Sequence, residues 1–334
     1  MYLDFTDEKY KQLALSKKIV NYENNVTAKD AFIALLKGLD YELMDNLCVD
    51  VANKLTMDDP QKIYKLVQSN QCDDNLKNLI LYTAYEIVHS KRFIGSKKRN
   101  GRPLTSWVSH CLYEGELASQ FATKMGLNPD VAMKLGIVHD IGRKFDHSFC
   151  HTIKGFEFLV DEGLIDEAFC TLSHSFLTEE KNGVYKGNRN AICDPPLEGF
   201  YVDSNGNGLI KEGTKKDDIT DFLENYEYNT YDVVINIADL MAMTVGIVSP
   251  YERLIDIYTR KKPDPKNSAY FKVCFINNLN RIMYQITNNE EYSKPINLND
   301  MKSESEINEM LIKTSANFML MYQRQIIQEK GMSL

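Results

Sequence analysis

The sequence lacks the long apolar runs that membrane proteins need. No uninterrupted apolar segment of membrane-spanning length occurs among its 334 residues. The N-terminal letters MYLDFTDEKYKQ are charged and contain no apolar signal core, so no secretory signal is expected. We therefore expect a cytoplasmic protein without a membrane partner.

Patterned cysteines are missing as well. The chain has seven cysteines, an odd number, with irregular spacing and no CxxC pair. Such a set argues against a disulfide framework and against a structural zinc knuckle. A reducing compartment is the natural expectation.

The chain has no excess of basic charge. Lysine and arginine total 39 against 47 aspartates and glutamates, which gives a net charge of −8. An acidic chain has no general electrostatic reason to coat nucleic acid, so no extended nucleic-acid surface is expected. A P-loop and a GxGxxG motif are also absent. An anionic substrate must therefore be held by local basic residues or by metal.

Helical patterns dominate the chain and predict an all-α fold. The pattern of residues 1–95 predicts an N-terminal helical region. It includes an amphipathic helix at 75–90 and a helix that starts at Asp59–Pro60. A break rich in glycine and base follows at 95–103. We place the domain boundary there, so that a second domain covers residues 96–334. Further helices are expected at residues 106–125, 128–142, 151–162, 165–175 and 231–247, with C-terminal helices in 266–334.

Residues 176–228 look different from this helical background. They contain prolines, glycines and the stretch YVDSNGNGLI, in which Asn–Gly separates apolar segments and indicates a hairpin. The same letters match the first half of a calcium loop, but Thr214 stands where a bidentate glutamate is required, so we favour the turn. A small β-hairpin insertion is therefore expected.

The candidate chemistry lies in the histidines. There are six, and five of them fall between residues 110 and 174. His139 and Asp140 are adjacent at the end of the apolar helix in LGIVHDIGRKFD, where the backbone can turn and let both reach one ion. Asp239 interrupts the apolar segment VVINIADLMAM, where its charge needs compensation by a metal or by a helix-cap hydrogen bond.

These residues form a recognisable series. His110, His139–Asp140 and Asp239 resemble the H…HD…D signature of the HD-domain metal-dependent phosphohydrolase superfamily, over residues 100–250. The resemblance implies an HD-type helical bundle within 96–334 and a metal site made by these four residues. It implies a hydrolase that uses metal-activated water on a phosphate ester or nucleotide.

Two further histidines resemble a dinuclear subset of that superfamily. His151 begins HTIKGFEFL, and His174 lies in TLSHSF. With both, the site has six protein ligands, enough for two ions bridged by Asp140. The alternative is that His151 only starts a helix and that His174 binds substrate. Iron, manganese, zinc, nickel and magnesium are not distinguished.

Some positions depart from the family pattern or stay open. Arg143 stands where the family usually has lysine, although Lys144 follows, and either side chain can neutralise phosphoryl charge. The Gly-Tyr-Pro tail of cyclic di-GMP phosphodiesterases is absent. We rank His147 as a loop residue near the site, and we expect His89 to pack or to face solvent.

Three functional questions stay open at this point. A dinuclear-iron oxygenase and a non-catalytic nucleotide sensor are alternatives to a hydrolase on the same ligand set. The basic run at 97–102 predicts either a solvated loop or a clamp for substrate phosphates. The 176–228 insertion, tethered between His174 and Asp239, predicts either a surface hairpin or a lid. A lid would present Lys181, Tyr185, Lys186 and Arg189 to substrate.

Overall fold

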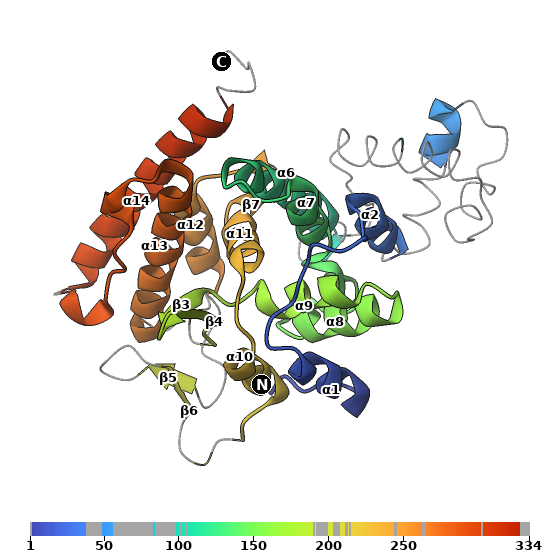
Figure 1. Cartoon of the computed structure of the whole chain (residues 1–334), viewed down its shortest axis with the longest axis horizontal. Coiled ribbons are helices and arrows are strands. Elements are labelled where there is room, and N and C mark those ends of the chain that lie inside the picture. Colours follow the sequence, from blue (N-terminus) through green and yellow to red (C-terminus); the bar gives the residue numbers. More distant parts are fainter. Residues whose placement is uncertain are drawn as a thin grey trace.

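A computed structural model gives the fold, which is mostly helical as predicted (Figure 1). The description below covers residues 2–37, 49–55, 83, 98–99, 102–103, 106–189, 191, 200–202, 208–210, 213, 215–243, 246–261, 265–301 and 303–327. The predicted helix at 75–90, the helix start at Asp59–Pro60 and His89 lie outside these residues.

Five helices form the centre of the molecule, and we call them the central bundle. Helices α6 and α7 pack side by side, α8 and α9 form a second pair, and α11 lies against α6, α7 and α9. Their bounds are Ser106–Lys124 for α6, Pro129–Val138 for α7, His151–Asp161 for α8, Ile165–Ser173 for α9 and Thr230–Asp239 for α11. Three of them, α6, α8 and α9, match the predicted helices closely. Helix α7 ends at Val138 and not at Gly142, and α11 ends at Asp239, so the predicted helix 231–247 is wrong beyond that residue, where two short strands follow.

Local sequence explains where these helices begin. The Asn128 side chain accepts a hydrogen bond from the Asp130 amide. Pro129 occupies the first position of α7, where a main-chain N–H would have no partner within the helix, so its absence costs nothing. Asn229 and Asp232 form a reciprocal capping box at the start of α11. The N-terminal ends of both helices are thus fixed by side chains near them in sequence.

Glycines let α6 and α7 approach closely. A β-carbon on Gly136 would lie 2.7 Å from the α-carbon of Gly115, a distance that no side chain tolerates. The two backbones therefore meet at these glycines. This contact brings His110 near the C-terminal end of α7, where His139 follows.

The N-terminal segment packs onto the central bundle. It contains α1, Glu8–Ser16, and α2, Ala28–Lys37, and residues 49–54 are also helical. Helix α2 lies against α7, and the Tyr22 hydroxyl donates to Asp232 of α11 at 2.8 Å. The domain boundary near residue 95 remains a prediction.

Short antiparallel strand pairs interrupt the helical pattern, as predicted for 176–228. Thr178 pairs with Gly187, and Phe200 pairs with Ile210. The strands are β1 (Lys98–Arg99), β2 (Arg102–Pro103), β3 (Thr178–Lys181), β4 (Val184–Gly187), β5 (Phe200–Val202), β6 (Gly208–Ile210), β7 (Ala242–Met243) and β8 (Gly246–Ile247). Helix α10, Asp218–Asn225, follows β6. The calcium-loop letters at 203–207 and Thr214 lie outside the described residues.

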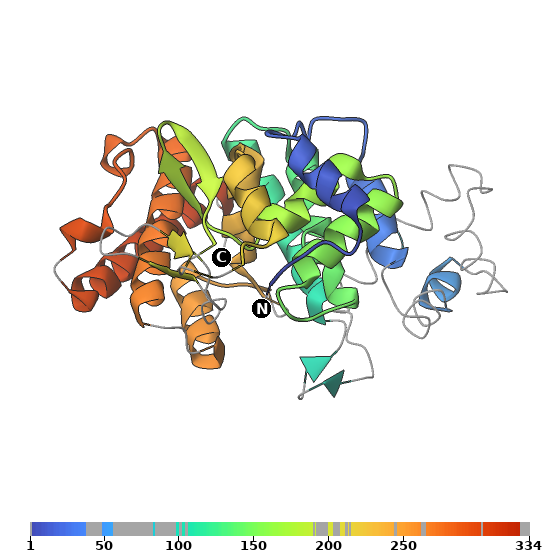
Figure 2. The ribbon, with the colours of Figure 1, turned by 90° about the horizontal axis from the view of Figure 1, so that it is seen from below.

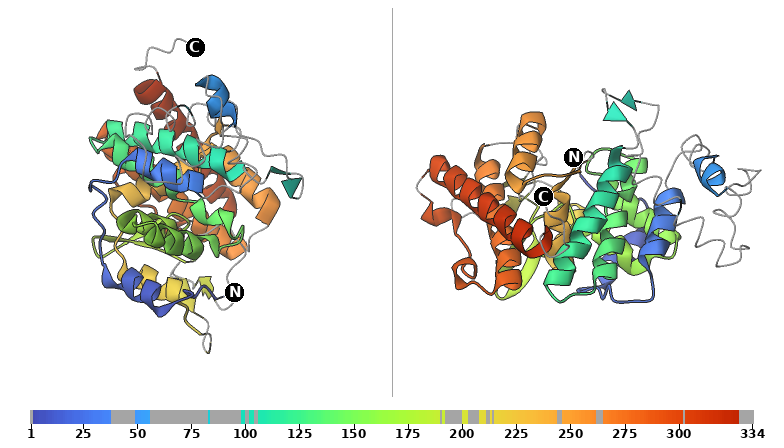
Figure 3. Two further views of the ribbon diagram at one scale, coloured as in Figure 1. Left: turned by 90° about the vertical axis from the view of Figure 1, so that its right-hand side faces the viewer. Right: turned by 90° about the horizontal axis from the view of Figure 1, so that it is seen from above.

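The C-terminal helices lie at the opposite end of the molecule from α1 and α2 (Figure 2). They are α12 (Pro250–Lys261), α13 (Pro265–Thr287) and α14 (Glu304–Tyr322), with short turns at Glu290–Tyr292 and Leu298–Asp300 and a final turn at Gln323–Ile327. The Ser303 side chain accepts from the Glu306 amide and so caps the start of α14. The right-hand view in Figure 3 shows the central bundle between these two ends, and the left-hand view looks along the long axis. Within the described residues, no helix is long and apolar enough to cross a membrane.

Candidate metal centre

Adjacent His139 and Asp140 reach one cluster because helix α7 ends just before them. Helix α7 stops at Val138, and the His139 amide donates to the Leu135 carbonyl as its last helical bond. Asp140 has φ −105° and ψ 13°, outside the helical region, and a 3₁₀ turn over Ile141–Lys144, η1, follows. This change of direction gives both side chains access to the same centre, as predicted.

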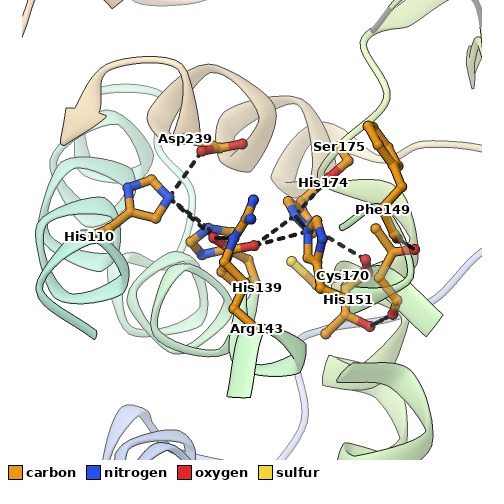
Figure 4. Close-up of polar contacts among 12 residues, drawn as sticks. His110, His139, Arg143, Phe149, His151, Cys170, His174, Ser175 and Asp239 are labelled. Carbon is orange, nitrogen blue, oxygen red and sulfur yellow. Dashed lines mark hydrogen bonds and ion pairs between the residues drawn. The ribbon is translucent and has the colours of Figure 1, made fainter. Parts of the chain in front are cut away.

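Four histidines surround that centre, and Figure 4 shows them converging from α6, α7, α8 and α9. Each Nδ1 contacts a main-chain carbonyl oxygen. These contacts are His110 to Ala242 at 3.1 Å, His139 to Gly136 at 2.7 Å, His151 to Ser148 at 2.5 Å and His174 to Thr171 at 3.0 Å. A carbonyl oxygen only accepts, so each Nδ1 carries the hydrogen and each Nε2 presents a lone pair to the centre.

Asp140 lies between two pairs of histidines. Its Oδ1 is 3.0 Å from Nε2 of His151 and 3.4 Å from Nε2 of His174. Its Oδ2 is 3.6 Å from Nε2 of His110 and 3.7 Å from Nε2 of His139. Each carboxylate oxygen therefore faces a different pair, the arrangement expected of a bridging ligand.

The spacing of the nitrogen atoms fits bound cations. Nε2 of His110 and Nε2 of His139 are 3.1 Å apart, and those of His151 and His174 are 3.2 Å apart. Two lone pairs at this distance repel each other, whereas two neighbouring ligands of one ion at about 2.1 Å lie about 3 Å apart. The donors, imidazole nitrogen and carboxylate oxygen, also suit divalent metals.

Two carboxylates complete the His110 side. Nε2 of His110 is 3.1 Å from Oδ1 of Asp239, and Nε2 of His139 is 2.8 Å from Oε2 of Glu114. Within the described residues, two groups can hold a metal ion, each with its donor atoms within 4.8 Å of one another. They are His110, Glu114, His139 and Asp239, and His139, Asp140 and His174.

Glu114 was missed in the sequence analysis, although a signal was present. It lies four residues after His110, so the two share one face of α6. The helix around it is apolar, with Cys111, Leu117 and Ala118 all buried. A carboxylate at such a position requires a partner in the same way as Asp239.

Burial and neighbouring charges set the protonation of the cluster. Burial lowers the pKa of His139 to about 3, which keeps its imidazole neutral. Burial, reinforced by the charges of Asp239 and Asp140, raises the pKa of Glu114 well above its usual range. Burial opposes ionisation of Asp140, but Arg143 together with His139 and His151 outweighs it and holds the pKa of Asp140 well below the ordinary value. The carboxylate form of Asp140 is thus favoured at the centre.

One edge of the cluster is accessible and carries two guanidinium groups. The Asp140 side chain is 2% exposed, whereas those of Asp239 and Arg143 are 21% and 32% exposed. Arg143 Nε pairs with Asp140, and Arg253 of α12 lies 3.9 Å from Asp239. Arg253 was not foreseen, since it lies outside the segment that carries the resemblance.

Two predicted residues lie away from the centre. Lys144 is exposed and its Nζ donates to the Lys37 carbonyl at 3.0 Å, so the structure does not bring this predicted catalytic residue to the cluster. On the η1 turn, consecutive side chains point about 120° apart, so Arg143 and Lys144 cannot both face Asp140. His147 is exposed on the loop before α8.

Three side chains proposed to form a lid make other contacts, two of them within the insertion itself. Lys186 donates to the Glu224 carbonyl at 2.5 Å, and Arg189 pairs with buried Asp217. The Arg281 guanidinium lies 3.4 Å from the centre of the Tyr185 ring. These contacts give no support to the hypothesis of a substrate lid.

Comparisons of the chain with protein-family models, curated proteins and solved structures gave no significant match. Functional inference therefore depends on the residues and their geometry.

Proposed function

We propose that the protein is an HD-type metal-dependent phosphohydrolase that holds two divalent ions. One observation carries the proposal: Asp140 presents each of its carboxylate oxygens to a separate pair of histidines. A histidine pair with a shared carboxylate on each side is the donor arrangement of a dinuclear site. The H…HD…D series supports the same assignment.

The residues divide by role. On one side, His110, His139 and Asp239 would hold the first ion, and on the other, His151 and His174 would hold the second, with Asp140 shared. Divalent ions in such a site lower the pKa of bound water and polarise a phosphoryl oxygen. The carbonyl contacts at Nδ1 fix the imidazole orientations, so that the site is organised before substrate arrives.

The substrate class follows from charge. The accessible edge places Arg143 and Arg253 beside Asp140 and Asp239 in a chain of net charge −8. Guanidinium groups bind phosphate oxygens in a forked geometry and neutralise the charge that develops on them. A small phosphate ester or nucleotide fits this edge better than a polymer, because the rest of the chain supplies no general positive charge.

The test is hydrolysis by the full chain after chelation and reloading with Mn²⁺. Phosphate release from a panel of monoesters, cyclic nucleotides and dinucleotides is expected, and it should disappear after chelation and return with Mn²⁺. Metal bound without any hydrolysis across the panel would contradict the proposal. Oxygen consumption by the iron-loaded protein would favour the oxygenase, and nucleotide binding without turnover would favour the sensor.

A further inference from the structure

Glu114 occupies an unusual position for a carboxylate. It is 0% exposed on α6, and neither of its oxygens has a hydrogen-bond partner among the described residues. Its Oε2 lies 2.8 Å from Nε2 of His139 and 3.7 Å from Nε2 of His110, the ring nitrogens that present lone pairs to the cluster. A buried carboxylate that lacks partners is costly unless a cation compensates it.

Orientation of His139 does not explain this carboxylate. The His139 ring is already fixed by its Nδ1 contact with the Gly136 carbonyl at 2.7 Å, whereas Glu114 lies next to the other ring nitrogen, Nε2. With the Nδ1 hydrogen used there, Nε2 has only a lone pair to offer, so a carboxylate oxygen approaches it closely only with a proton or a metal ion between them. The 2.8 Å approach fits two ligands of one ion, and in the metal-free protein the raised pKa of Glu114 lets a proton take the place of that ion.

The two sides of the cluster then differ in charge. The His110 side has two carboxylates of its own, Glu114 and Asp239, besides its share of Asp140. The other side has His151 and His174 with only the shared Asp140. A divalent ion is stabilised more strongly where more anionic oxygens meet it in a buried site.

We propose that Glu114 is a direct ligand of the ion on the His110 side and that it makes this the tighter of two unequal metal sites. The inference rests on the proposed metal centre and adds to it a ligand that the HD series lacks. Its consequence is ordered loading, with the His110 side filled first. Oxygen donors there also favour manganese or iron over a four-coordinate ion such as zinc.

Titration of metal-free full-length protein with Mn²⁺ alone tests the proposal, with bound ions counted by equilibrium dialysis and elemental analysis. In the natural sequence we expect two ions with separable affinities. In a His174→Ala background, the His110 side can be measured by itself. There Glu114→Gln, which removes the charge but keeps the shape, should weaken the remaining site by about 100-fold or more.

Glu116→Gln is the matched control, because Glu116 is on the same helix but only partly buried and outside the cluster. It should leave both affinities unchanged. A Glu114→Gln effect below tenfold would overturn the proposal, and so would an equal loss at both sites in the otherwise natural sequence. If Glu114→Gln fails to fold, Glu114→Asp serves in its place, because it keeps the charge on a shorter side chain. It should still weaken Mn²⁺ binding on the His110 side, and an unchanged affinity there would overturn the proposal. Failure of the natural sequence to bind Mn²⁺ would instead refute the metal centre itself.

Discussion

Gly142 and His151 are in such close contact that a side chain cannot fit between them. A β-carbon on Gly142 would lie 1.9 Å from the main-chain oxygen of His151 and 2.6 Å from the amide nitrogen of Gly155. The η1 turn that follows Asp140 is thereby pressed against the first turn of α8. This contact sets the distance between Asp140 and His151, two residues from different elements.

The first prediction is that Gly142→Ala separates the two halves of the cluster. The added methyl group must push η1 from α8, which should cost about 3 kcal/mol in the free energy of unfolding and weaken metal binding. Urea denaturation and metal content measure the two effects. Gly126→Asn serves as control, because Gly126 has φ 71°, which asparagine tolerates, and open space around it. A stable Gly142→Ala protein with full metal content would contradict this account.

The second prediction concerns Asp140. Asp140→Ala removes the carboxylate that faces both histidine pairs, so phosphate-ester hydrolysis should fall about 100-fold or more while helicity stays unchanged. Turnover and circular dichroism measure these quantities. Asp130→Asn, an exposed position at the other end of α7, should retain full activity. Full turnover by Asp140→Ala would rule out the proposed mechanism.

The third prediction is a metal count. Purified natural protein should contain close to two ions per chain, and His174→Ala should contain close to one, because Nε2 of His174 lies 3.2 Å from that of His151 on the second side. Elemental analysis gives the ratio directly. One ion per chain in both proteins would indicate a mononuclear site.

The fourth prediction is a pH dependence from Asp232, whose carboxylate accepts from Tyr22 and Ser173 in the core. Burial raises the pKa of Asp232 to about 6 despite these hydrogen bonds. Between the unfolded value of about 4 and this value, the folded state binds more protons than the unfolded state, so stability falls as pH rises.

Denaturation at several pH values can isolate this contribution. The free energy of unfolding of the natural protein, minus that of Asp232→Asn, should fall by about 2 kcal/mol between pH 4 and pH 6 and level off above about pH 7. A difference that rises with pH would mean that the hydrogen bonds dominate and that the folded pKa is depressed.

Local signals explain how much of this site was predictable. Asn128–Pro129 and the His139–Asp140 pair depend on residues close in sequence, and the structure places both as expected. Lys144 was expected to lie at the site beside Arg143, but it points away from the cluster because neighbouring side chains on a tight turn diverge. Sequence patterns could not show this, since the direction of η1 is set by its contact with α8. Arg253 reaches Asp239 only through the packing of α12, which no short motif encodes.

The last prediction tests whether Arg253 binds substrate or positions a ligand. Its Nη2 is 3.9 Å from Asp239 Oδ1, too far for a hydrogen bond, and its Nη1 donates to Asp256 at 3.3 Å. The guanidinium group is therefore oriented near the open edge without a direct bond to Asp239. Arg253→Met keeps the aliphatic stem and removes the charge, so the KM for a phosphate ester should rise about tenfold, as expected for the loss of one charge-assisted contact.

In that variant, metal content should hold, because none of the proposed ligands is removed. Arg260→Met on the same helix is the control, since Arg260 is exposed and its guanidinium group pairs with Asp256 one turn earlier. Loss of metal from Arg253→Met would show that the arginine positions Asp239 instead of binding phosphate. An unchanged KM with unchanged metal content would remove Arg253 from the substrate site altogether, and Arg143 would then be the sole guanidinium group proposed to contact phosphate.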